Sequence, residues 1–132
     1  MVLKMTDVEE LIKKGEELYN EGNYFEARQL FFEVCMDSDE AYPLYMLGYS
    51  LAGIVMTYLE EGDYDRVLFC CNEAIEAFEN LLSKQISDEM RQKSSGILEK
   101  LKGTQQDVKL AKERLEQKMK EFSEKDYREY ME

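Results

Sequence analysis

Apolar residues recur at intervals of three and four along most of this chain. The repeat is clearest near the end, at Val108, Ala111, Leu115, Met119 and Phe122. This spacing places apolar side chains on one face of an α-helix. No segment alternates apolar and polar residues as a half-buried strand would. The pattern therefore predicts an all-α fold.

Polar breaks divide the pattern into about six helices. Breaks near residues 21–23, 37–40 and 60–63 separate four helices, over roughly 6–20, 24–36, 41–59 and 64–82. A fifth helix is expected over 88–102 and a sixth from 104, because Gly103 can end a helix. Short connections favour antiparallel hairpins. We expect two hairpins in residues 1–83 and a third, in residues 84–132, that packs on or caps them.

One sequence motif, which covers a turn and the start of the following helix, occurs twice in the chain. The sequence "NEGNYFEA" at 20–27 and the sequence "EEGDYDRV" at 60–67 both place Gly before Asn or Asp and then Tyr. Gly permits a left-handed backbone, and Asn23 or Asp63 can cap the next helix. Two helical hairpins can bury their apolar faces by stacking, so the repetition indicates a helical-repeat architecture.

The first copy resembles the tetratricopeptide repeat. The positions that carry the resemblance are Gly15, Leu18, Gly22, Tyr24, Ala27, Phe31 and Val34. The second copy is looser, with Leu44, Leu47, Gly48, Leu51, Gly62, Tyr64, Val67, Cys71 and Ala74. Gly15 and Gly22 are 7 residues apart, whereas Gly48 and Gly62 are 14 apart, which makes the first helix of that copy about two turns longer. The resemblance covers roughly residues 6–82 and implies a right-handed superhelix that binds proteins.

The second copy departs from the family pattern, and another family offers an alternative. Val67 and Cys71 stand where the family has Ala and an aromatic residue, and Asp39 stands where it often has Pro. Residues 49–101 also resemble the microtubule-interacting and transport domain, a three-helix bundle with a similar Gly-Asp-Tyr turn. That resemblance implies a module that binds a helical peptide.

Charge is distributed unevenly over the 132 residues. The net charge is −12, yet residues 1–83 hold 18 acidic and 5 basic residues, and residues 84–132 hold 11 acidic and 12 basic ones. An acidic surface repels phosphate backbones, which argues against nucleic-acid binding and favours a basic partner, although the charge serves solubility equally well. No segment is long and apolar enough to insert into a membrane, and the start lacks the apolar core of a signal peptide. We expect a cytoplasmic protein.

The chain lacks several residue types and motifs that are common in catalytic sites. It has no His, and Cys35, Cys70 and Cys71 form no CxxC pair. These absences remove the common zinc sites and His-based acid–base chemistry. We expect no enzyme activity and no cofactor, and we expect the cysteines to be small buried residues, with a redox pair at Cys70–Cys71 as the alternative.

The tetratricopeptide resemblance implies a partner site on the first helix of each hairpin. Its positions here are Glu9, Ile12, Glu16, Tyr19, Tyr42, Tyr45 and Tyr49. The helix over 41–59 is apolar all round, so its tyrosines either pack in the core or face a partner. Acids at Glu9 and Glu16 would suit a protein or peptide that is basic with an apolar anchor. A structural role in a larger assembly is the other possibility.

The C-terminal region allows two interpretations. Its aromatic residues Phe122, Tyr127 and Tyr130 could reach back onto the repeats and complete the stack. Alternatively, the stripe that ends at Phe122 could form a dimerising coiled coil, although it is short for that purpose.

Overall fold

Five helices make up the described part of the chain. The structure, a computed structural model, describes the backbone of residues 5–131 and the side chains of residues 7–125. The helices are α1 (Met5–Asn20), α2 (Tyr24–Asp37), α3 (Ala41–Glu61), α4 (Tyr64–Leu82) and α5 (Asp88–Met131). The described residues contain no strand, which confirms the all-α prediction.

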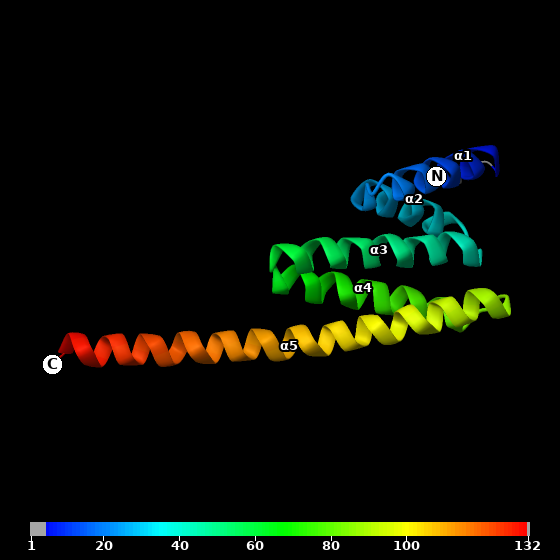
Figure 1. Cartoon of the computed structure of the whole chain (residues 1–132). Helices are drawn as coiled ribbons and strands as arrows, with labels where there is room; N and C mark the ends of the chain where they lie inside the picture. The colour runs from blue at the N-terminus through cyan, green and yellow to red at the C-terminus, as the bar shows by residue number, and fades with distance from the viewer. Residues whose placement is uncertain (1–4, 132) are drawn as a thin grey trace.

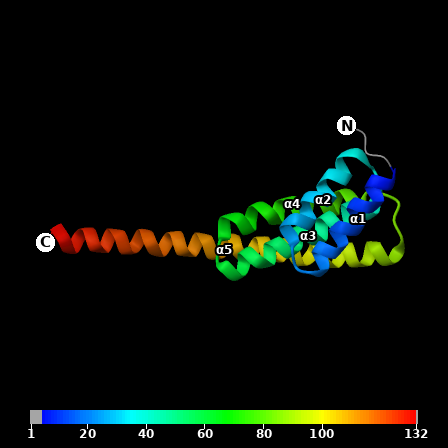
Figure 2. The same cartoon turned by 90° about the horizontal axis from the view of Figure 1, so that it is seen from above.

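The helices stack in chain order. Figure 1 shows each helix running back along the one before it, and each packs against the next. α1 also contacts α3. Seen from above in Figure 2, α2 and α4 lie toward one edge of the body, and α3 and α5 lie toward the other. The body therefore has one face built from odd-numbered helices and one built from even-numbered helices.

The two copies of the turn motif have the same backbone geometry. Gly22 and Gly62 have φ angles of 82° and 73°, in the left-handed region that glycine adopts at little cost. In the first turn the Gly22 amide donates to Tyr19 (3.0 Å) and the Asn23 amide to Leu18 (2.8 Å). In the second, Gly62 and Asp63 donate to the carbonyls at the same two offsets, both at 3.1 Å. Both turns thus close with the paired bonds of a Schellman motif.

Side-chain caps differ between the helices. The Asp63 carboxylate accepts from the Arg66 amide at 3.2 Å, and the Ser87 hydroxyl accepts from the Met90 amide at 3.2 Å. The expectation for Asn23 was wrong, because its side chain donates to Glu21 at 3.4 Å and caps nothing.

Two glycines allow the helices of each hairpin to approach closely. A Cβ atom at Gly15 would lie 2.7 Å from Cζ of Phe31, and a Cβ atom at Gly48 would lie 2.7 Å from Cζ of Phe78. Both Phe rings are fully buried. Because real Cβ atoms do not approach so closely, each ring occupies space that only glycine leaves free.

The second hairpin is extended on both of its helices. Phe31 follows Gly22 by 9 residues, whereas Phe78 follows Gly62 by 16, which matches the 7 extra residues between Gly48 and Gly62. Phe78, rather than Cys71, is thus the spatial counterpart of Phe31. Cys71 is fully buried in the added layer.

The expected third hairpin is absent from the described chain. Residues 88–131 form a single 44-residue helix, so the count of six helices and the hairpin over 84–132 were wrong. Gly103 does not have the positive φ of a helix-ending glycine. Glycine inside a helix costs only about 1 kcal/mol relative to Ala, and the flanking residues, rich in Lys, Gln and Leu, favour helix strongly enough to carry it.

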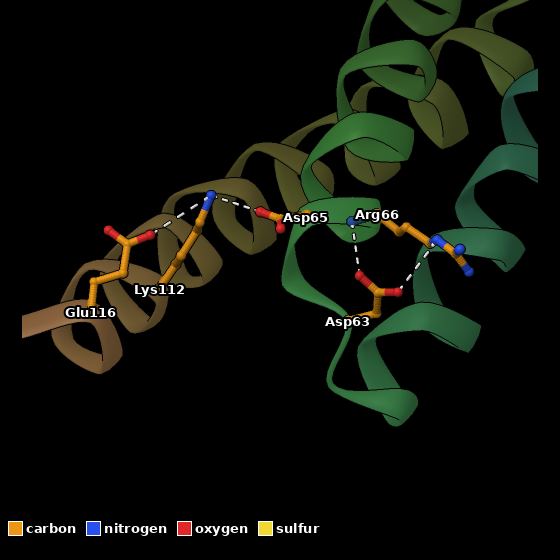
Figure 3. Close-up of polar contacts among 5 residues, drawn as sticks. All are labelled: Asp63, Asp65, Arg66, Lys112 and Glu116. Atoms are coloured by element: carbon orange, nitrogen blue, oxygen red, sulfur yellow. Dashed lines mark hydrogen bonds and ion pairs between the residues drawn. The ribbon is translucent and has the colours of Figure 1, made fainter. Parts of the chain in front are cut away.

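The first part of α5 covers α4. Leu98, Leu101 and Val108 are buried there. At the rim, Lys102 pairs with Glu79 (3.6 Å) and Lys112 with Asp65 (2.6 Å). Figure 3 shows Lys112 between Asp65 and Glu116 of α5, beside the Asp63 cap. This part of α5 seals the last hairpin.

Beyond Lys112 the helix leaves the body. Every residue of 113–125 is exposed, and both views show this end projecting alone (Figures 1 and 2). The expectation that Phe122 reaches back was wrong, because its side chain is 66% exposed. The side chains of Tyr127 and Tyr130 lie outside the described residues.

The two kinds of glycine predict opposite responses to the same substitution. Gly48→Ala should lower the free energy of unfolding by about 2 kcal/mol, because the new methyl group must displace the buried Phe78 ring. Gly103→Ala should raise it by about 1 kcal/mol, because open space surrounds this mid-helix glycine. Urea unfolding followed by circular dichroism measures both. If Gly103→Ala instead lowered the free energy of unfolding, that result would indicate that a helix ends at Gly103.

Candidate functional site

An open groove lies across the odd-numbered helices. Its volume is about 510 Å³. α1, α3 and α5 all contribute to its walls, which are lined by Glu16, Tyr19, Asn20, Tyr42, Tyr45, Met46, Tyr49 and Lys93. Residues 77 positions apart in the sequence therefore meet at one surface.

Three tyrosines of α3 form a ladder along the groove. The ring centroids of Tyr42 and Tyr45 are 6.4 Å apart, and those of Tyr45 and Tyr49 are 4.8 Å apart. Tyr49 packs edge-to-face on Phe78 at 5.6 Å. Because Phe78 is fixed against Gly48, the inner end of the ladder is anchored in the core. The outer end is open, with Tyr42 38% exposed.

Burial shifts the ionisation of the groove tyrosines. It is the largest cause that raises the pKa of Tyr49 to about 12, followed by a hydrogen bond with Tyr45. The pKa of Tyr42 is also raised, first by burial and then by the charge of Glu16 and a hydrogen bond to its carboxylate. The raised pKa keeps the phenols of Tyr42 and Tyr49 neutral at physiological pH, so that both can donate hydrogen bonds.

The groove carries one acid and one base on opposite walls. Glu16 is half-buried on α1, next to Tyr42. Lys93 is exposed on α5, where its amine pairs with Glu89 at 3.0 Å. Glu89 is the main cause of the raised pKa of Lys93. Lys93 already has a carboxylate partner, whereas no Lys or Arg among the described side chains forms an ion pair with Glu16.

Five of the seven residues predicted from the sequence meet in this groove. They are Glu16, Tyr19, Tyr42, Tyr45 and Tyr49. Glu9 is exposed on α1 outside the groove, and Ile12 packs against the core. Asn20, Met46 and Lys93 were not predicted. Asn20 lies four residues after Glu16 on α1, and Met46 lies four residues after Tyr42 on α3, so the helical register would have indicated both.

A second groove lies on the opposite face, between α2 and α4. It has a volume of about 440 Å³, and its walls include Phe25 (50% exposed) and Phe69 (65% exposed). Arg28 crosses it to pair with Glu73 at 2.8 Å. This ion pair links α2 to α4 across the apolar floor of α3, which gives the groove a structural role.

The cysteines fit a packing role. All three are free; Cys71 is buried, and Cys35 and Cys70 are half-buried. Burial raises the pKa of Cys35 and of Cys71 to about 11, which keeps both thiols protonated and weakly nucleophilic at neutral pH. Among the described residues, no group of three or more Cys, Asp or Glu is placed to hold a metal ion. None of the described helices has the length and apolar character needed to cross a membrane.

Comparisons with protein-family models, with curated proteins and with solved structures find no match to this chain.

Tyr49 gives the folded state a defined sensitivity to alkaline pH. Its pKa in the folded state is about 12, above the 10.0 of an unperturbed Tyr, so folding favours the neutral phenol. Its contribution to stability is complete below pH 10 and is lost as the pH rises from 10 to 12. Tyr49→Phe should therefore make the free energy of unfolding fall less steeply across this range, as measured by urea unfolding at stepwise pH. Equal slopes for the two proteins would contradict the partial burial of Tyr49 as the cause of its raised pKa.

Proposed function

We propose that this protein is a non-enzymatic adaptor of the tetratricopeptide type, which holds a segment of another protein in the groove of α1, α3 and α5. The single observation that carries the proposal is the tyrosine ladder at an open groove. Tyrosine combines an apolar ring with a polar tip, which suits a surface that alternates between water and a partner.

The arrangement of the helices supports the choice of family. The two turns share one hydrogen-bond pattern, and each hairpin closes by a Phe ring on a glycine. The first helices of the hairpins lie on one face together with α5. In tetratricopeptide proteins the corresponding face binds peptides, which is why we place the partner there.

The alternative three-helix module over residues 49–101 fits the groove less well. It would leave out α1, which supplies Glu16, Tyr19 and Asn20 to one wall. It would also leave out Tyr42 and Tyr45. We therefore favour the repeat architecture over the microtubule-interacting and transport type.

The chemistry of the groove indicates a basic segment with an apolar anchor. Glu16 can pair with a Lys or Arg of the partner, while the rings of Tyr45 and Tyr49 receive an apolar side chain. The excess of acids in residues 1–83 attracts basic segments at longer range and raises their association rate. A segment ending in a free carboxylate would be repelled by Glu16.

Two synthetic peptides test this proposal. They share a Phe anchor and a Leu and differ only in their charged residues, which are Lys in one and Glu in the other. We expect the Lys peptide to bind more tightly, measured by fluorescence anisotropy, and its affinity to fall with added salt. Tyr45→Ala should weaken binding of the Lys peptide by at least about tenfold, as loss of a central aromatic contact typically does.

A matched pair of charge reversals locates the site. Glu16→Lys should weaken binding of the Lys peptide by about tenfold, whereas Glu10→Lys should change it by less than about twofold. Both residues lie on α1, but Glu10 is exposed outside the groove. Equal effects of the two substitutions, or equal affinities for the two peptides, would refute the assignment of the groove.

A further inference from the structure

The projecting end of α5 carries an apolar stripe without a partner in the described chain. Leu115, Met119 and Phe122 are 50%, 62% and 66% exposed. They lie three and four residues apart, so they share one side of the helix. No other helix accompanies this end in either view (Figures 1 and 2). An isolated helix of this length is only marginally stable in water, so the end gains from a covering partner.

The stripe continues the interface that already joins α5 to α4. Leu101 and Val108 are buried against the body and are seven residues apart. The same interval leads to Leu115 and then to Phe122. A seven-residue apolar repeat keeps one face of a helix turned toward a neighbouring helix. The face that packs on α4 thus runs on past Tyr64, where α4 begins, and is shaped for another helix in line with α4.

The charged residues beside the stripe indicate which kind of helix could pack on it. Within the body, bases of α5 meet acids of α4, at Lys112–Asp65 and Lys102–Glu79. Along the free end, Lys118 and Lys125 border the stripe on one side, with Arg114 next to them. Glu121 lies further round the helix, where the Gln117 amide bonds it at 3.1 Å. This border of the stripe is therefore basic, whereas the other border carries Glu116 and Ser123.

A second copy of the chain is a poor partner for this surface, because its charges do not complement those of the first copy. Antiparallel pairing of two α5 ends would set the basic border of one against the same border of the other. Parallel pairing would bring two bodies together, each with 18 acidic and 5 basic residues in positions 1–83. Both arrangements place like charges side by side, which disfavours self-association.

We propose that the free end of α5, residues 113–125, is a second docking site, which binds an amphipathic helix with one acidic flank from another protein. The partner helix takes the place of α4 along the stripe, with its apolar residues on Leu115, Met119 and Phe122 and its acids on Lys118 and Lys125. The site is independent of the groove of α1, α3 and α5, so the protein joins two partners.

Two helical peptides and the full-length protein test the docking site. The peptides share a Leu stripe at heptad spacing and carry either Glu or Lys along one flank of that stripe. We expect the Glu peptide to bind and to slow amide hydrogen exchange in residues 113–125. Leu115→Ser should weaken its binding by about thirtyfold, since burying a Leu contributes roughly that factor. Lys118→Glu should weaken it by about fivefold, and Lys120→Glu, on the opposite side of the same helix, by less than about twofold.

The alternatives give distinct results. Equal binding of the two peptides, or equal effects of Lys118→Glu and Lys120→Glu, would overturn the proposal. Failure of the Glu peptide to bind would also overturn the proposal. This holds if sedimentation shows a monomer, and it holds if sedimentation shows a dimer that Leu115→Ser dissociates. Glu16→Lys serves as a further control, because it should weaken binding in the groove and leave the Glu peptide unaffected. The two sites can therefore fail separately.

Discussion

The contact between Gly48 and the Phe78 ring fixes the geometry on which the groove depends. It brings α3 and α4 so close that a Cβ atom at Gly48 would lie 2.7 Å from Cζ of the ring. The immobilised ring supports Tyr49, Tyr49 supports Tyr45, and the ladder then opens toward solvent at Tyr42. A packing constraint in the core thus preorganises the proposed binding surface, and such preorganisation lowers the entropy lost on association.

The parts of this fold that depend on local rules could be predicted from the sequence. A helix that ends in a left-handed turn needs glycine, and the repeated Gly with Asn or Asp marked both turns correctly. Gly103 shows the limit of the same rule. Whether a glycine ends a helix or sits within it depends on a difference of about 1 kcal/mol, and favourable neighbours outweigh it here. The residue type alone does not reveal its φ angle.

The candidate groove was predictable where it follows from helical register and unpredictable where it follows from packing between distant segments. Tyr42, Tyr45 and Tyr49 share a side of α3 by their spacing alone, and the structure places them together. Lys93 reaches the same groove only because α5 packs on α4 in a particular register, which no local pattern encodes. The tetratricopeptide spacing also suggested Cys71 as the counterpart of Phe31, because no local pattern in α4 reveals the 7 extra residues between Gly62 and Phe78.

The seven-residue apolar repeat of α5 is buried against the body in one part of the helix and exposed to solvent in the other. Leu98, Leu101 and Val108 are buried where α5 packs on α4, so they contribute to the stability of the body. From Leu115 onward the same positions face solvent, so they contribute little to that stability and remain accessible to the proposed partner helix. The Lys112–Asp65 pair at 2.6 Å marks the boundary (Figure 3). Because the two halves share one continuous helix, a partner held at the end keeps a fixed orientation to the body, and a flexible linker could not provide this.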